Sequence, residues 1–122
     1  MKKKVLIVED DRLLTIVLKK MAMAMNFNVV DTAQGGQDAI ASVEEHKPDL
    51  ILMDILLADS ISGIDAMETI RKHSDVPVIY ISAQTDTDIK TKAVSVSNSF
   101  FLMKPVNMAE LESAVNVVQF AA

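Results

Sequence analysis

The stretch Leu50-Ile51-Leu52-Met53-Asp54 is the most hydrophobic strand-like run of the chain, and it ends in a carboxylate. A carboxylate in that position is costly to bury unless another group compensates its charge. Two other apolar runs also end in charge: residues 5–8 precede three acids, and residues 100–103 precede Lys104. If the three runs are neighbouring parallel strands, their charged ends meet at one edge of a sheet.

Short β-branched runs alternate with longer runs of helical period along the whole chain. We predict strands over residues 3–8, 29–30, 50–54, 78–81 and 100–103. We predict helices over residues 12–25, 37–45, 63–73 and 86–97, and a last helix capped by Asn107. The fourth helix is the weakest of these predictions, because its Ser, Thr and Val are mediocre helix formers. Strict alternation with right-handed crossovers predicts an α/β fold, a doubly wound parallel sheet of five strands with five helices.

The composition limits the class of protein. A length of 122 residues predicts one domain, and the net charge of −5 argues against a direct nucleic-acid-binding surface. The absence of cysteine excludes disulfides and thiolate metal sites. No apolar run approaches the ~20 residues that span a bilayer, and the N-terminus lacks a signal-peptide pattern. We therefore expect a cytoplasmic protein without membrane insertion.

Polar residues stand where the predicted strands end. In doubly wound sheets, ligands bind outside the carboxyl ends of the strands. The residues at those ends are Glu9, Asp10, Asp54, Ser82 and Lys104. Acids, a hydroxyl and a lysine in one crevice indicate a phosphoryl and metal site.

Four short signatures occur together in one order: Val8-Glu9-Asp10-Asp11, Leu52-Met53-Asp54-Ile55, Ile81-Ser82-Ala83 and Met103-Lys104-Pro105. With them the chain resembles the receiver (CheY-like) domain of two-component response regulators, from about residue 3 to residue 119. The resemblance implies a flavodoxin-like sheet of strand order 2-1-3-4-5. It also implies a single receiver domain over residues 1–122.

The resemblance assigns roles to the strand-end residues. Asp54 would be the nucleophile and phosphorylation site, taking a phosphoryl group from a histidine kinase or a histidine phosphotransfer protein. Asp10, Asp54 and the backbone carbonyl of Leu56 would bind Mg²⁺, with Glu9 acting through water. Lys104 would neutralise the phosphoryl oxygens, before a cis peptide bond to Pro105. Such a domain catalyses only its own phosphorylation and hydrolysis, so it is not a conventional enzyme.

The same resemblance implies a switch. Ser82 and the Ala83 amide would move toward the phosphoryl group, and Phe101 would fill the vacated space. An ordinary core phenylalanine is an equal alternative for Phe101. The output face would comprise the fourth helix, the fifth strand and the last helix, with the fourth helix the most mobile. A phosphorylation-dependent homodimer is a further expectation, and the downstream target is not specified by the sequence.

Several positions depart from the commonest receivers. The segment from Asp54 to Gly63 is one residue longer, and Ala58 stands where proline is frequent. Leu56 and Gln84 occupy positions that tune hydrolysis in relatives. Because Leu56 offers no polar group to orient a water molecule, we expect a long-lived acyl phosphate.

Three other functions fit the sequence less well. An aspartyl-nucleophile phosphatase would need a second acid where Leu56 stands. A flavin or nucleotide module would need a glycine-rich phosphate loop, and the chain has only three glycines. An inert receiver-like interaction domain conflicts with the intact acids and lysine. A stand-alone regulator and a receiver from a larger regulator or hybrid kinase remain equally open.

Overall fold

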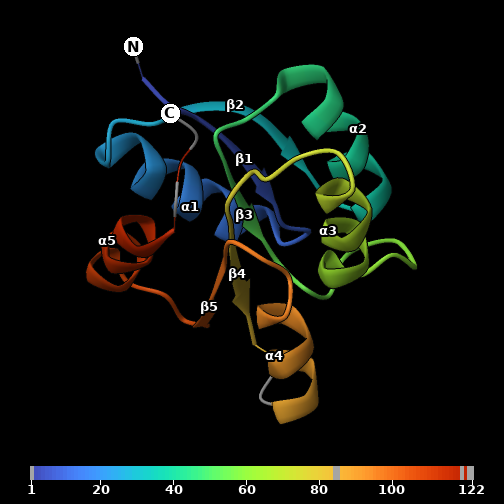
Figure 1. Ribbon diagram of the computed structural model, residues 1–122. Helices are drawn as coiled ribbons and strands as arrows, with labels where there is room; N and C mark the ends of the chain where they lie inside the picture. Colours follow the sequence, from blue (N-terminus) through green and yellow to red (C-terminus); the bar gives the residue numbers. More distant parts are fainter. Residues whose placement is uncertain (1, 84–85, 119, 121–122) are drawn as a thin grey trace.

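The computed structural model describes residues 2–83, 86–118 and 120, and in this part of the chain five strands alternate with five helices (Figure 1). The strands are β1 (Lys4–Val8), β2 (Asn28–Ala33), β3 (Leu50–Met53), β4 (Val78–Ser82) and β5 (Ser99–Met103). The helices are α1 (Arg12–Ala24), α2 (Gly36–His46), α3 (Gly63–Arg71), α4 (Thr87–Val94) and α5 (Met108–Val117). The alternation predicted from the sequence is confirmed.

All strand pairs are parallel, and the strand order is β2-β1-β3-β4-β5, as the resemblance implied. The order reverses between β1 and β3, which are neighbours in the centre of the sheet with Val8 paired to Met53. The carboxyl ends of these two strands therefore lie side by side. Doubly wound sheets bind their ligands at this position.

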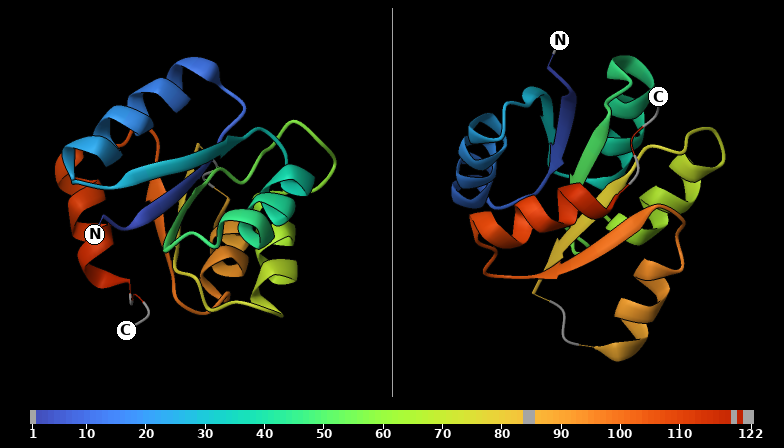
Figure 2. Two further views of the ribbon diagram at one scale, coloured as in Figure 1. Left: turned by 90° about the horizontal axis from the view of Figure 1, so that it is seen from above. Right: turned by 60° about the vertical axis from the view of Figure 1, so that its left-hand side comes forward.

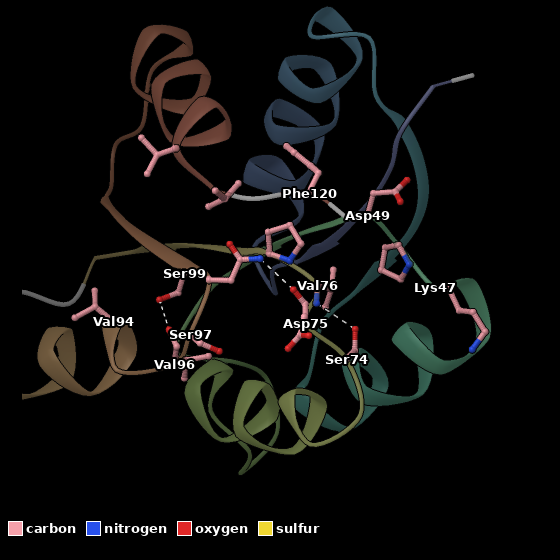
Figure 3. Close-up of a pocket in the computed structure, with 15 residues that line it drawn as sticks. Lys47, Asp49, Ser74, Asp75, Val76, Val94, Val96, Ser97, Ser99 and Phe120 are labelled. Atoms are coloured by element: carbon pink, nitrogen blue, oxygen red, sulfur yellow. Dashed lines mark hydrogen bonds between the residues drawn. The ribbon is translucent and has the colours of Figure 1, made fainter. Parts of the chain in front are cut away.

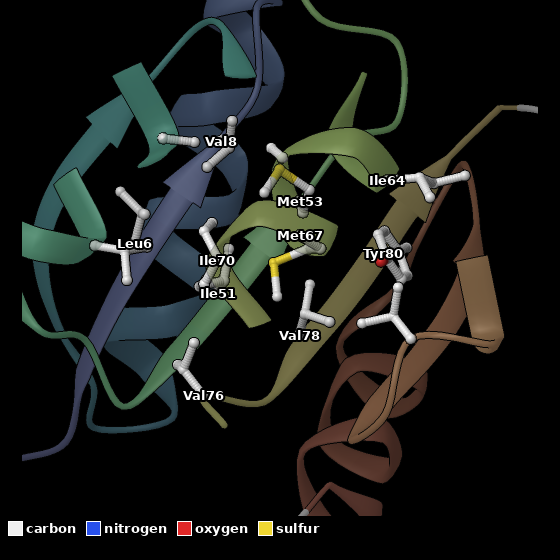
Figure 4. Close-up of a cluster of buried hydrophobic side chains, with 14 of the residues drawn as sticks. Leu6, Val8, Ile51, Met53, Ile64, Met67, Ile70, Val76, Val78 and Tyr80 are labelled. Atoms are coloured by element: carbon white, nitrogen blue, oxygen red, sulfur yellow. The ribbon is translucent and has the colours of Figure 1, made fainter. Parts of the chain in front are cut away.

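Helices cover both faces of the sheet, with α1 and α5 on one face and α2, α3 and α4 on the other (Figures 1 and 2). Side chains alternate across the strands, so Val5 and Ile7 face α1 and α5 while Leu6 and Val8 face the opposite layer (Figure 4). The central strand β3 is buried along its whole length. This burial accounts for its uninterrupted apolar sequence.

The second strand is longer than predicted. It runs from Asn28 to Ala33, where the sequence indicated only residues 29–30. Its pairing with β1 shifts register after Val29, leaving Val30 as a bulge, and Asp31 then pairs with Leu6. Because β2 is an edge strand, its polar residues reach solvent or neighbouring side chains, and Asp31 accepts a 2.7 Å hydrogen bond from Ser42. Asp31 and Thr32 interrupt the apolar run after Val30, so the sequence indicates only the first part of the strand.

Two predicted N-caps are confirmed. The Asp11 side chain accepts hydrogen bonds from the amides of Leu13 and Leu14 at the start of α1. Asn107 and Glu110 form a reciprocal capping box at the start of α5. Asp11 therefore belongs to the helix end, which leaves Glu9 and Asp10 as the acidic pair that follows β1.

Candidate functional site

Three acids meet at the carboxyl ends of β1 and β3. One carboxylate oxygen from each of Glu9, Asp10 and Asp54 lies within 4.8 Å of the other two. Glu9 and Asp54 are buried, with 2% and 6% of their surfaces exposed, whereas Asp10 is exposed. The parallel pairing of the two strands causes this proximity, because the Asp54 amide donates to the Val8 carbonyl at 2.9 Å.

The lysine at the end of β5 reaches the same acids. Lys104 Nζ lies 2.9 Å from Asp54 Oδ2 and 3.0 Å from Glu9 Oε1. The Lys104 amide donates to the carbonyl of Ser82 at 2.9 Å, which continues the pairing with β4 one residue past the end of β5. The Lys104–Pro105 peptide bond is cis, as the resemblance implied. One ammonium thus faces two buried carboxylates.

The surroundings change the protonation of two of these groups. Burial raises the pKa of Glu9 to about 7, although the Asp11 amide and Lys104 both stabilise its charged form. Burial alone would lower the pKa of Lys104, but its hydrogen bonds to Asp54 and Glu9 outweigh this, and the pKa is raised. The lysine is therefore a permanent cation, while Glu9 holds a proton over part of the physiological pH range.

The remaining predicted site residues lie around this centre. Ser82 is buried at the end of β4. Phe101 is half-buried on β5, where it pairs with Tyr80 and packs against the core beneath α4. The centroid of its ring lies 5.8 Å from Lys90 Nζ. The Leu56 side chain is 59% exposed. Gln84 lies outside the described residues.

The two ends of the loop between β3 and α3 are hydrogen-bonded to each other next to Asp54. Asp54 Oδ1 accepts a hydrogen bond of 2.7 Å from the amide of Ile55, whose carbonyl accepts from Gly63 at 2.8 Å. A Cβ atom on Gly63 would overlap the Asp54 carbonyl oxygen. Only glycine therefore allows the start of α3 to lie this close to the residue after β3.

Sequence reasoning missed Asp59, which lies in the same loop. Its carboxylate accepts hydrogen bonds from the amides of Gly36 and Gln37, at the start of α2. A weak signal was present in the sequence. Helix α2 begins at Gly35-Gly36, neither of which has a side chain that can cap it, so its first amides are open to an acceptor from another segment.

A large pocket lies away from the acids. It has a volume of about 930 Å³ and is lined by residues at the amino ends of β3, β4 and β5 and by the ends of α4 and α5, including Asp49, Asp75, Val94 and Phe120 (Figure 3). The acids lie at the carboxyl ends of the strands, on the opposite edge of the sheet. The pocket and the acidic site are therefore separate features.

Comparison with known families decides the assignment. The sequence model of the response regulator receiver domain matches residues 5–116. The chain belongs to the response regulator receiver family. Similar curated proteins include the transcriptional regulatory protein KdpE of Staphylococcus aureus (33% identity, covering 98% of this chain and 51% of KdpE). Another is PdtaR of Mycobacterium tuberculosis (30% identity, 94% of this chain and 56% of PdtaR). This receiver domain thus spans about half the length of the relatives it matches.

Solved structures agree with the family. The receiver domain of a modulated diguanylate cyclase from Desulfovibrio desulfuricans has a TM-score of 0.86 and 25% identity, covering 97% of this chain and 94% of that one. A chain of the CheX–CheY–BeF3–Mg²⁺ complex from Borrelia burgdorferi has a TM-score of 0.85 and 26% identity, covering 93% and 86%. CheY4 of Vibrio cholerae, at 22% identity with a TM-score of 0.86 and 98% and 100% coverage, supports the fold alone.

Receiver domains bind Mg²⁺ at an acidic cluster, and the oxygens gathered here suit that ion. Magnesium is a hard cation that takes one or two carboxylates together with water and phosphoryl oxygens. Two buried carboxylates facing one lysine leave an excess of negative charge, which a divalent cation would neutralise. None of the helices within the described ranges is long and apolar enough to cross a membrane.

Proposed function

We propose that this receiver domain accepts a phosphoryl group on Asp54 from a phosphohistidine of a kinase or phosphotransfer protein. The observation that carries the proposal is the pair of short contacts from Lys104 Nζ to Asp54 and Glu9. A cation held against a strand-end carboxylate stands where the oxygens of a transferred phosphoryl group would need their charge compensated.

In the proposed reaction, an Asp54 oxygen bonds to phosphorus while the bond from phosphorus to the imidazole nitrogen breaks. The electron pair of that bond stays with the imidazole. Because Asp54 attacks as a carboxylate, no general base is required. The contribution of the protein is to align the nucleophile with the leaving nitrogen and to stabilise the phosphoryl oxygens through Lys104.

We assign the metal ligands to Asp10, Asp54 and the Leu56 carbonyl, with Glu9 acting through water. The proximity of the three carboxylates supports this assignment. Bound Mg²⁺ would supply charge neutralisation at the phosphoryl oxygens. Glu9, whose pKa is about 7, would give up its proton as the site takes up a cation.

We assign the readout to Ser82 and Phe101. Ser82 is buried beside Lys104 at the strand ends. Ser82 pairs with Met103 of β5, and Phe101 lies two positions before Met103 on the same strand. Helix α4 covers Phe101 and buries only Ala93 among its own residues, so little packing opposes its movement. The output face would consist of α4, β5 and α5.

The partner surface is assigned to α1, next to the acids. Its exposed residues include Leu13, Ile16, Val17 and Met23, an apolar group on the solvent side of the helix. Such an apolar surface suits docking of a helix that carries the phosphohistidine. Dimerisation after phosphorylation, the activity of any attached output domain and the extension of one receiver domain over residues 1–122 stay predictions.

The test is phosphorylation by a small donor. The protein is incubated with acetyl phosphate and Mg²⁺, and the intact mass is measured. We expect the mass of one phosphoryl group on the wild type and on Asp65→Asn, a matched control at an exposed acid of α3. Asp54→Asn should remain unmodified. An unmodified wild type, or full modification of Asp54→Asn, would overturn the proposal.

A further inference from the structure

The β3–α3 loop, residues 55–62, is attached to α2 by hydrogen bonds that the phosphorylation chemistry does not require. The Ala58 amide donates to the carbonyl of Gln34 at 3.0 Å. Asp59 Oδ1 accepts from Gly36 at 2.9 Å, and Asp59 Oδ2 accepts from Gln37 at 3.0 Å. The loop thus supplies the N-cap that α2 lacks, from a residue 23 positions further along the chain.

Residues at the start of α2 and residues of the β3–α3 loop both shape the contact between these two segments. A Cβ atom on Gly35 would lie 2.7 Å from Asp59 Oδ2, so the carboxylate approaches where only glycine leaves room. A Cβ atom on Gly36 would meet the side chain and carbonyl of Ile61. The Ile61 amide donates to Asp59 Oδ1 at 3.2 Å, which orients the carboxylate within its own loop. The hydrogen bonds from Gln37 and Gly36 lower the pKa of Asp59.

Leu56 lies between two fixed points of this loop. On one side, Ile55 is held by Asp54 Oδ1 and by the Gly63 amide. On the other side, Ala58 is held by Gln34, just before α2, and Asp59 is held by the start of α2. Fixing a segment at both ends restricts the backbone conformations of the residues between them. The Leu56 carbonyl, one of the assigned metal ligands, belongs to that segment.

We propose that Asp59 is a positioning residue for the Mg²⁺ site, because its attachment of the loop to α2 holds the Leu56 carbonyl in a binding-competent position. This inference rests on the proposed function. Asp59 acts through Leu56 and touches neither the metal nor the phosphoryl group. Its loss lowers the fraction of molecules whose loop is ready to bind Mg²⁺, and the apparent affinity falls by the same factor.

The experiment measures Mg²⁺ binding to the unphosphorylated protein by calorimetry. For Asp59→Ala we expect a dissociation constant raised about fivefold, the factor set by a binding-competent fraction of about one fifth. Asp59→Asn keeps one acceptor oxygen, so its dissociation constant for Mg²⁺ should lie between those of wild type and Asp59→Ala. The matched control is Asp38→Ala, which removes the same charge from the first turn of α2 without touching the loop, and it should leave the affinity within about twofold of wild type.

Two further readouts separate positioning from general stability. At saturating Mg²⁺ the rate of phosphorylation by acetyl phosphate should be the same for Asp59→Ala and wild type. Gly35→Ala displaces the same carboxylate from the side of α2, so the two substitutions combined should weaken binding no more than either alone.

The outcomes are distinct. Equal Mg²⁺ affinities for Asp59→Ala and Asp38→Ala would overturn the role of Asp59 and leave the proposed function intact. Additive effects of Gly35→Ala and Asp59→Ala would also overturn it. A wild-type protein that binds no Mg²⁺ would overturn both the metal assignment and this inference.

Discussion

Lys104 Nζ lies 2.9 Å from Asp54 Oδ2, although 50 positions of the chain separate the two residues. Strand β4 lies between the strands that carry them, so the lysine side chain extends across the end of β4 to reach Asp54. Glu9 shares the same ammonium at 3.0 Å. The three groups form one electrostatic unit, so removing the charge of any one of them changes the electrostatic environment of the other two.

Removing the lysine charge should destabilise the folded protein. Lys104→Met leaves two buried carboxylates without their cation, and we expect a loss of about 2 kcal/mol in the free energy of unfolding at pH 8. Lys104→Arg keeps the charge and should lose less. Urea unfolding without Mg²⁺ measures both variants. Equal stabilities of Lys104→Met and wild type at pH 8 would contradict the coupling.

The buried acid predicts a pH dependence. The pKa of Glu9 is about 7 in the folded protein against an ordinary value of 4.5, so the folded state binds the proton more tightly. The corresponding stability is fully present below about pH 4.5 and is lost as the pH rises through about 7. Between pH 5 and pH 8 without Mg²⁺, we expect this group to reduce stability by roughly 1–3 kcal/mol.

The control for this pH dependence is Glu9→Gln, which cannot ionise and should show a flatter profile over the same range. Added Mg²⁺ should reverse the trend in the wild type, because metal binding requires deprotonated carboxylates. Parallel profiles of Glu9→Gln and wild type in chelator would refute the assignment of the slope to Glu9.

The glycine at the start of α3 should tolerate no side chain. In Gly63→Ala the new methyl group would overlap the Asp54 carbonyl and lie 2.8 Å from Met53 Cγ, so the strand end must shift. We expect a destabilisation of about 3 kcal/mol in urea unfolding. Thr69→Ala, an exposed position in the same helix, should change stability by no more than about 0.5 kcal/mol. Similar stabilities of the two variants would show that the backbone around Gly63 can shift to accommodate a methyl group at little cost in free energy.

The exposed side chain of Leu56 should affect how long phosphorylation lasts. Leu56→Asn introduces a polar group that can orient a water molecule toward the acyl phosphate, so we expect faster dephosphorylation. The decay is followed by intact mass after removal of acetyl phosphate, in the presence of Mg²⁺. Leu13→Asn, an equally apolar exposed position on α1, serves as the control. Identical decay of Leu56→Asn and wild type would rule out this role.

The alternation of elements and the gathering of charged residues at the strand ends follow largely from the sequence. Apolar runs that end in charged residues marked β1, β3 and β5, and the helical runs between them implied parallel pairing. The caps Asp11 and Asn107 can be predicted because capping signals are local in the sequence. The sequence indicates only part of β2, since an edge strand keeps polar residues that interrupt its apolar pattern.

The alternation of strands and helices, the residues at the strand ends and, through the four signatures, the family can be inferred from the sequence without the structure. Only the folded structure shows that the Lys104 ammonium contacts Asp54 at 2.9 Å and Glu9 at 3.0 Å, that the pKa of Glu9 is about 7, and that Asp59 caps α2. The difference lies in the distance along the chain over which each physical effect acts. Hydrophobic period and capping act within a few residues, whereas burial and charge pairing depend on groups that only the packed sheet brings together.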